Sequence, residues 1–387
     1  MIGNSNNLST SNEIAYETEW SRRLSRIANL KTFHIPPVVV GNTTDIELGQ
    51  TMVLEWKTQG MFQVACTPDV CTSSQLVLEA SHKFFARPMA EKMSYVSDLT
   101  FAGYIASGEE LTAGEVDYSE IFTIVKDLSL NDKRVQDGWP GHGPVPWPSL
   151  SYKKALQNFL IKLGSIGDRI LQLISLGLNL PNINTLKSIA NDGWHHARVL
   201  RYPPISSESS RGTGSHTDYG LLVIVTQDDA GGLFIRPPID QEIRNRNWLP
   251  SESSAGMYED CVEWNFVKPT PSALTVFPGD MFQLLTDGVL LSTPHKVHRA
   301  EKERYSIAYF HEPNFQQIIK SVNKTDATDF VHYGEHVTNM FLRGYPERIT
   351  SKRIERENRM DIIAKLKKKA MLDVVQDHAL EEDQADK

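Results

Sequence analysis

The sequence predicts a mainly β protein, a sandwich or barrel with helices packed outside it. Between Trp194 and Phe310, short runs of β-forming residues alternate with Gly, Pro and Asn, which is the spacing typical of such folds. Before Trp194, and again over 351–372, apolar residues instead recur at helical spacing. We therefore expect helices to flank a central β region.

The composition describes an ordinary globular chain. Of its 387 residues, 40% are apolar and 23% are charged, which excludes disorder, collagen and coiled coil. With 40 Lys and Arg against 48 Asp and Glu, the net charge of −8 provides no general attraction for nucleic acid or anionic lipid. We expect small-molecule partners, no nucleic acid, no membrane, and a monomeric chain.

The cysteines and the N-terminus indicate a cytoplasmic protein. Cys66, Cys71 and Cys261 are too few, and odd in number, for a disulfide framework, so we interpret all three as structural residues in a reducing compartment. No apolar run reaches the length of a bilayer span. Residues 1–25 have the composition of neither a signal peptide nor an anchor.

The part of the chain before the β region is expected to combine helices with strands. Residues 1–30 would form a flexible extension, and 31–190 would pack on the core. The elements expected there are a β-rich run (33–40), a helix (49–58) that Gly60 ends, a strand (61–64), and two more helices (76–93, interrupted at Pro88, and 152–174).

Residues 191–315 are expected to form the β core. Its clearest predicted strands are 221–225, 232–235, 273–277 and 305–310. Residues 316–372 would form a C-terminal helical region that contains the amphipathic helix 351–372, and 373–387 a polar tail.

Three residues of the core have the pattern of a metal site. His216 and Asp218 precede the strand 221–225, and on an extended backbone their side chains point to the same face. His295, in a later Pro-flanked segment, would complete a facial triad of two histidines and one carboxylate, which leaves three positions of an octahedral Fe(II) open.

The other histidines fit this pattern less well. His298 is the alternative third ligand, but its odd spacing from His295 puts it on the opposite face of an extended strand. We interpret the adjacent His195 and His196 as structural. The remaining candidates have no partner at ligand spacing, and the His-Glu-x-x-His motif of zinc proteases is absent.

Arg304 and Ser306 follow the triad closely. If residues 300–303 form the turn of a hairpin, His295 and Arg304 lie on paired strands, and Arg304, Ser306, Ala308 and Phe310 share one face. A forked guanidinium beside a hydroxyl suits the far carboxylate of a dicarboxylate that chelates iron through its 2-keto acid end. O2 would take the remaining open position.

The region from about Phe33 to Asn314 resembles the isopenicillin N synthase-like branch of the Fe(II)/2-oxoglutarate-dependent oxygenases. The segments that carry the resemblance are 60–64, 201–204, 214–220, 231–233, 277–280 and the set His295, Arg304 and Ser306. The resemblance implies a double-stranded β-helix, a distorted jelly roll flanked by helices. It also implies His216, Asp218 and His295 as iron ligands and Arg304 as the anchor of 2-oxoglutarate, which is used together with O2.

Further segments resemble the ethylene-forming members of that family. They are 97–100, 106–114, 138–148, 192–200, 244–250 and 332–343. The resemblance implies cleavage of 2-oxoglutarate to ethylene and CO2. It also implies oxidation of L-arginine at C5, giving guanidine and pyrroline-5-carboxylate, coupled to decarboxylation of 2-oxoglutarate to succinate.

The same resemblance implies further site residues. Arg198 would lie beside the keto acid in a pocket lined by Leu200, Phe277, Ala308 and Phe310, and L-arginine would contact Glu110, Thr112, Tyr219 and Arg343. Physical chemistry supports two of these contacts, because Glu110 offers a carboxylate for the guanidinium and Arg343 a cation for the α-carboxylate.

The chain departs from the ethylene-forming pattern at Tyr202, Ser306 and Gly344, the first two of which add hydroxyl groups near the pocket. Our hypothesis is that arginine oxidation is retained, whereas the ethylene yield is not predicted. The main alternative is a 2-oxoglutarate oxygenase that acts on another small molecule with little or no ethylene formation. An iron oxidase without 2-oxoglutarate, a non-catalytic metal-binding jelly roll and a zinc hydrolase are weaker alternatives.

Overall fold

The computed structural model describes residues 26–385, apart from 206–208, 262 and 323–328. Most of the expected N-terminal extension, residues 1–25, lies outside the described residues. None of the described helices combines the length and the apolar character that crossing a bilayer requires. Cys66, Cys71 and Cys261 are all free thiols.

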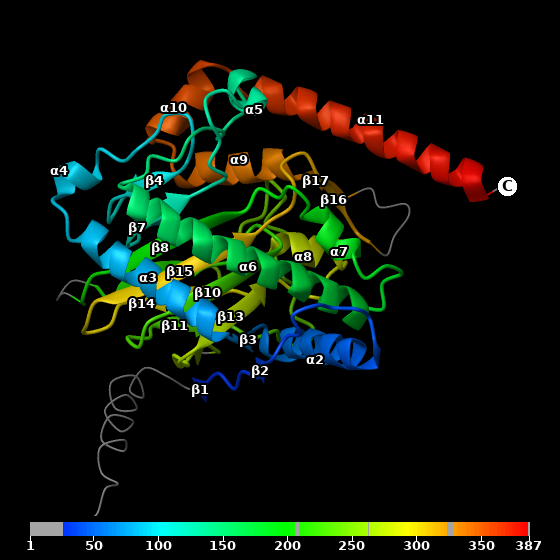
Figure 1. Ribbon diagram of the computed structural model, residues 1–387, viewed down its shortest axis with the longest axis horizontal. Helices are drawn as coiled ribbons and strands as arrows, with labels where there is room; N and C mark the ends of the chain where they lie inside the picture. Colours follow the sequence, from blue (N-terminus) through cyan, green and yellow to red (C-terminus); the bar gives the residue numbers. More distant parts are fainter. Residues whose placement is uncertain (1–25, 206–208, 262, 323–328, 386–387) are drawn as a thin grey trace, which may run out of the picture.

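The chain before the β core forms short strands and several helices (Figure 1). In order they are β1 (Arg26–Ile27), β2 (Thr32–Phe33), α2 (Thr43–Gln59), β3 (Phe62–Ala65), α3 (Pro68–Phe85), α4 (Met89–Lys92), β4 (Gly103–Ile105), β5 (Leu111–Thr112), β6 (Glu115–Val116), β7 (Glu120–Ile124), α5 (Lys133–Gln136), α6 (Leu150–Gly177) and α7 (Thr185–Ile189).

Residues 196–311 form mostly strands, and most of the C-terminal part of the chain after them forms helices. The strands and the one helix among them are β8 (His196–Tyr202), β9 (Arg211–His216), β10 (Leu222–Gln227), β11 (Leu233–Ile235), β12 (Asn265–Phe266), β13 (Ala273–Pro278), α8 (Asp280–Leu285), β14 (His295–His298) and β15 (Arg304–His311). They are followed by β16 (Ile318–Lys320), β17 (Phe330–His332), α9 (Tyr333–Gly344), α10 (Ile349–Arg356) and α11 (Met360–Ala385).

Two sheets carry the core. The larger has the strand order β2-β3-β13-β10-β15-β8-β7-β4, and the smaller has the order β1-β12-β11-β14-β9. Figure 1 shows α3 and α6 lying across the larger sheet, while α11 runs along the top of the view and extends beyond the rest of the fold. This arrangement is the predicted jelly roll flanked by helices.

Helix α6 confirms the predicted helix at 152–174 and extends it at both ends. Its N-cap is Ser149, whose side chain accepts a hydrogen bond from Tyr152 N. An apolar stripe along α6 is buried, which anchors the helix to the sheet below. Helix α2 packs closely on α6 because Gly49 has no side chain: a Cβ there would lie 2.1 Å from the carbonyl oxygen of Leu173.

Several sequence-based boundaries were wrong. Within the expected β-rich run 33–40, only Phe33 belongs to a strand, and the Pro36-Pro37 pair lacks the N–H groups that a ladder needs. The helix expected at 49–58 begins earlier, at Thr43, because the Asn42 side chain caps it. The helix expected at 76–93 is α3 followed by the short α4. The two strands β16 and β17 interrupt the expected helical region, and α11 continues through most of the expected polar tail.

The predicted hairpin at 300–303 was also wrong. Strand β14 belongs to the smaller sheet, where it pairs with β9 and β11, whereas β15 belongs to the larger sheet between β10 and β8. The chain therefore crosses from one sheet to the other between His298 and Arg304. This crossing puts the third member of the triad and Arg304 on opposite sheets of the jelly roll.

Candidate active site

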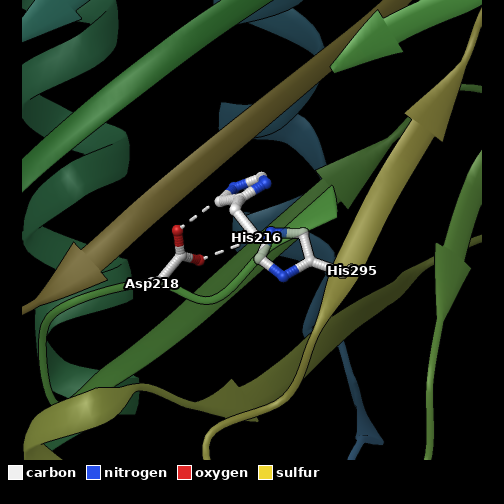
Figure 2. Close-up of side chains that lie close together, drawn as sticks. All are labelled: His216, Asp218 and His295. Carbon is white, nitrogen blue, oxygen red and sulfur yellow. Dashed lines mark ion pairs between the residues drawn. The ribbon is translucent and has the colours of Figure 1, made fainter. Parts of the chain in front are cut away.

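The structure brings His216, Asp218 and His295 together. His216 ends β9 and His295 begins β14, and the two residues are paired in the antiparallel register of these strands. Each histidine Nε2 lies 3.6 Å from a different oxygen of Asp218. Figure 2 shows the three side chains pointing toward one another, and one donor atom of each lies within 4.8 Å of the others.

Backbone carbonyls orient both imidazole rings. Nδ1 of His216 lies 2.8 Å from the carbonyl oxygen of Gly214, and Nδ1 of His295 lies 3.1 Å from that of Thr293. A proton on each Nδ1 would donate to these carbonyls, which leaves both Nε2 lone pairs directed at the space beside Asp218. Two imidazole nitrogens and one carboxylate form a donor set that suits Fe(II).

The carboxylate of Asp218 is held in its ionised form. Burial by itself would raise the pKa of Asp218, but electrostatic interactions with His295, His216 and Arg198 lower it below its ordinary value. The main chain of Asp218 is also fixed, because its carbonyl oxygen accepts a 2.8 Å hydrogen bond from Asp280 N. Asp280 in turn accepts hydrogen bonds from Ser292 Oγ (2.6 Å) and Asn247 Nδ2 (2.9 Å), which joins the segment before β14 to the loop of Asp218.

Arg304, on β15 of the larger sheet, offers a preformed site for an anion. Its side chain is 1% exposed and lies over the ring of Tyr202, 4.8 Å from the centroid. Nη2 donates to Gln227 Oε1 over 3.4 Å, whereas Nε and Nη1 have no hydrogen-bond partner among the described residues. A buried guanidinium with two unsatisfied nitrogens favours an anionic ligand, and a carboxylate matches its forked geometry.

The predicted lining residues share one wall of the larger sheet. In the pairing of β8 with β15, Arg198 lies opposite Ala308, Leu200 opposite Ser306, and Tyr202 opposite Arg304. Phe277 and Phe310 flank Val223 of β10 from the two neighbouring strands. The ring of Phe277 also lies 4.8 Å from that of His295, so this wall meets the triad.

Sequence comparisons agree with this geometry. The 2OG-Fe(II) oxygenase superfamily profile matches residues 194–313, and a profile for the N-terminal region of a non-haem dioxygenase in morphine synthesis matches residues 40–150. A 2-oxoglutarate-dependent ethylene/succinate-forming enzyme of Ralstonia nicotianae is 52% identical over 337 residues, which cover 87% of this chain and 97% of the relative. The chain belongs to the 2OG-Fe(II) oxygenase superfamily. It is therefore a 2-oxoglutarate-dependent dioxygenase, which requires Fe(II), 2-oxoglutarate and O2.

More distant relatives extend the comparison. A homoarginine-6-hydroxylase of Arabidopsis thaliana is 27% identical over 281 residues, covering 69% of this chain and 72% of the relative. A full-length Neurospora crassa protein in complex with α-ketoglutarate and thymine has a TM-score of 0.64 at 22% identity, covering 82% of this chain and 97% of that chain. A putative 2OG-Fe(II) oxygenase family protein of Caulobacter crescentus has a TM-score of 0.65 at 20% identity, covering 82% and 99%. These two structures confirm the predicted jelly-roll fold.

The comparisons decide against three of the alternatives left open by the sequence. The superfamily match disfavours a non-catalytic jelly roll and a zinc hydrolase, and the relative at 52% identity, which depends on 2-oxoglutarate, disfavours an iron oxidase that does not use it. The donor set of the triad fits an iron ion, and the two Arg304 nitrogens without a partner among the described residues fit a dicarboxylate.

Among the residues expected to contact L-arginine, Glu110 contacts the wall of this oxygenase directly, through Arg198. One of its oxygens, Oε1, accepts a 2.8 Å hydrogen bond from Arg198 Nη2 and another from the hydroxyl of Tyr345. Burial would raise the pKa of Glu110, but Arg198 and Tyr345 lower it below its ordinary value. Tyr345 was not predicted, because nothing in the sequence around it indicates a partner so distant along the chain.

Thr112 lies on the hairpin that follows Glu110. The buried carboxylate of Asp117 connects this residue to the strand that ends at His216. Its hydroxyl donates to Asp117 over 2.5 Å, and Asp117 also accepts 3.0 Å hydrogen bonds from Gly214 N and Arg211 Nε. Gly214 is the residue whose carbonyl orients His216. Asp117, which sequence reasoning missed, therefore connects the hairpin to the strand that ends at the triad.

Tyr219 and Arg343 are the two other residues expected to contact L-arginine. Tyr219 follows Asp218 directly and is half-buried, with its ring 6.2 Å from that of His336. Arg343 is exposed on the last turn of α9 and makes no ion pair or hydrogen bond with any residue that the structure describes.

His196 stacks on Phe310 at 4.2 Å, and His195 Nδ1 accepts a 2.9 Å hydrogen bond from Glu312 N, in line with their interpretation as structural residues.

Proposed function

We propose that this oxygenase cleaves 2-oxoglutarate to ethylene and CO2, and that in the same site it oxidises L-arginine at C5 while 2-oxoglutarate is converted to succinate. The arginine product would break down to guanidine and pyrroline-5-carboxylate. His216, Asp218 and His295 would hold Fe(II), and Arg304 would bind the distal carboxylate of 2-oxoglutarate. The observation that carries the proposal is the wall that joins the triad to the guanidinium of Arg304, two nitrogens of which have no hydrogen-bond partner among the described residues.

Each end of 2-oxoglutarate would meet a different part of this site. When bound, Fe(II) supplies the redox chemistry that lets O2 cleave the keto acid. Arg304 orients the far carboxylate through a forked pair of N–H donors, and Leu200, Phe277, Ala308 and Phe310 keep water from the carbon chain between the two ends.

The hydrogen bonds of the Ser306 and Tyr202 hydroxyl groups, at two positions where the chain departs from the ethylene-forming pattern, support ethylene formation. The hydroxyl of Ser306 donates to the carbonyl oxygen of Thr226 over 3.0 Å, and that of Tyr202 bonds to Thr213 Oγ1 over 3.1 Å. Both groups thus have protein partners, so the wall facing the cosubstrate is less polar than its residue types suggest. The name of the Ralstonia relative, ethylene/succinate-forming, supports the same pair of products.

L-arginine is supported by Glu110 and Thr112. Glu110 offers a buried carboxylate, and its Oε2 has no hydrogen-bond partner among the described residues. Because the proton of Thr112 is used by Asp117, its oxygen is left as an acceptor, which suits a guanidinium that can only donate. Tyr219 and Arg343 complete the proposed set. We also propose that the chain acts as a monomer, because all of these residues come from one chain.

Another guanidino compound is the second candidate substrate. Arg343, the proposed partner of the substrate carboxylate, is exposed and can adjust its position, so a chain one methylene longer than arginine is compatible with the site. The Arabidopsis relative is named for its action on homoarginine.

The test combines spectroscopy with product analysis. Fe(II) and 2-oxoglutarate are added to the full-length protein without oxygen, and the visible charge-transfer band of the chelated keto acid is recorded before and after L-arginine or homoarginine is added. Oxygen is then admitted, ethylene is measured in the headspace, and guanidine and succinate in solution. A band that shifts with L-arginine, followed by ethylene and guanidine, is expected. Succinate with neither guanidine nor ethylene would contradict the proposal.

A further inference from the structure

One oxygen of Glu110 makes all of the hydrogen bonds of its carboxylate. Oε1 accepts from Arg198 Nη2 and from the hydroxyl of Tyr345, and the same Nη2 also donates to that hydroxyl. The other oxygen, Oε2, is buried without a partner among the residues that the structure describes. The side chains of Arg198 and Glu110 are only 15% and 14% exposed, so water screens this pair weakly.

A substrate guanidinium cannot use this carboxylate fully while Arg198 stays in place. A forked pair of hydrogen bonds requires both carboxylate oxygens, and Oε1 already has two donors. A second guanidinium beside Arg198 would also put two positive charges against one carboxylate in a poorly solvated site. A guanidino substrate and Arg198 therefore compete for Glu110.

Arg198 also borders the proposed metal site. It lies on β8 opposite Ala308, on the wall that also carries Leu200 and Tyr202. Phe277, which lines the same wall, has its ring 4.8 Å from that of His295, so Arg198 and the triad share one site. An anionic keto acid held at the triad would attract Arg198 once the pairing with Glu110 is broken.

We propose that the Glu110–Arg198 ion pair is a resting-state lock, which a substrate guanidinium opens by replacing Arg198 at Glu110. The released Arg198 then turns to the carboxylate of 2-oxoglutarate beside the metal. This inference rests on the proposed function, in which Glu110 binds the guanidinium of the substrate. The lock makes the binding of substrate and 2-oxoglutarate cooperative. By thermodynamic linkage, each ligand increases the affinity of the protein for the other by the same factor.

The test is a set of anaerobic titrations of the full-length Fe(II) protein with 2-oxoglutarate, followed by the charge-transfer band. In the wild type, saturating L-arginine is expected to tighten 2-oxoglutarate by about 5- to 100-fold. Glu110→Gln is expected to tighten it to a similar degree without L-arginine, and to abolish any further gain. Tyr345→Phe keeps both charges and removes one hydroxyl, so a smaller gain is expected. Glu115→Gln, at an acid that is 74% exposed on the same hairpin, is the control that leaves the affinity unchanged.

A double-mutant cycle separates the lock from simple charge removal, because the loss of a nearby negative charge also favours an anion. If the lock operates, Glu110→Gln no longer tightens 2-oxoglutarate in an Arg198→Gln background. The same gain in both backgrounds would overturn the lock, as would wild-type affinity in Glu110→Gln.

Failure of the proposed function gives a different result. If Glu110→Gln loses the response to L-arginine but binds 2-oxoglutarate as the wild type does, the substrate assignment stands and the lock is wrong. If the wild type does not respond to L-arginine while Glu110→Gln still gains affinity through Arg198, the lock stands and L-arginine is wrong.

Discussion

His216 and His295 face each other across the pairing of β9 with β14, with their ring centroids 4.2 Å apart. One strand register therefore places two of the three proposed metal ligands, and Asp218 follows from the loop at the end of β9. A slip of one residue in this pairing would turn either imidazole to the opposite face of the sheet.

The third ligand can be tested by comparing two histidines on the same strand. His295→Gln is expected to weaken Fe(II) binding by more than about tenfold, because a direct ligand is lost. His298→Gln is the matched control, since the ring of His298 packs against Phe234 at 5.0 Å rather than joining the triad. Iron content after dialysis against a weak chelator measures both. Loss of iron from His298→Gln alone would contradict the proposed triad.

Arg304→Gln is expected to weaken 2-oxoglutarate binding by about 2–5 kcal/mol, because the distal carboxylate would lose a buried, charged partner. The charge-transfer titration gives the affinity. Arg201→Gln on β8 is the control, because Arg201 is paired with Glu120 and Glu303 instead of belonging to the wall. Unchanged 2-oxoglutarate affinity in Arg304→Gln would contradict the assignment of Arg304 to the 2-oxoglutarate site.

Removing the extra hydroxyl groups is expected to leave the products nearly unchanged. Ser306→Ala and Tyr202→Phe should alter the ratio of ethylene to succinate by less than about twofold, because both hydroxyls already bond to protein atoms. Each variant should lose about 1 kcal/mol of stability, since Thr226 O or Thr213 Oγ1 loses its partner. Headspace gas chromatography and succinate assays measure the ratio. A large rise in ethylene in either variant would show that the hydroxyl group removed in that variant faces the cosubstrate in the wild type.

The stability of the metal-free protein is expected to depend on pH through Glu312. Burial, with the fields of Asp218 and Asp280, raises the pKa of Glu312 from 4.5 to about 8. The folded state therefore favours the neutral acid, and its contribution to stability is complete below about pH 4.5 and lost as the pH rises toward 8.

Glu312→Gln removes this dependence while keeping an acceptor for Leu221 N. Its Tm should exceed that of the wild type by more at pH 8 than at pH 5, with a difference in unfolding free energy on the order of a few kcal/mol. Glu115→Gln, at an exposed site, should follow the wild type at every pH. A constant difference between Glu312→Gln and the wild type across this range would refute the pKa assignment.

Much of the fold could be predicted because its signals are local. The stripe of α6 and the alternating strands β10, β13 and β15 follow from spacing along the chain, since helix and strand geometry set which neighbours share a face. For the same reason, the sequence predicts that His216 and Asp218 act together. The capped start of α2 at Asn42 was missed because the expected helix relied on its apolar residues alone.

The sequence by itself determined the ligand types, their local spacing and the alternating face of β15. Only the tertiary structure decided that His295 pairs with His216 while Arg304 lies in the other sheet, and that Glu110, Arg198 and Tyr345 meet in one cluster. It also left Arg343, expected to contact the substrate, exposed. The physical reason is that the pairing of strands in a jelly roll depends on which distant faces are buried together, and spacing along the chain does not carry that information.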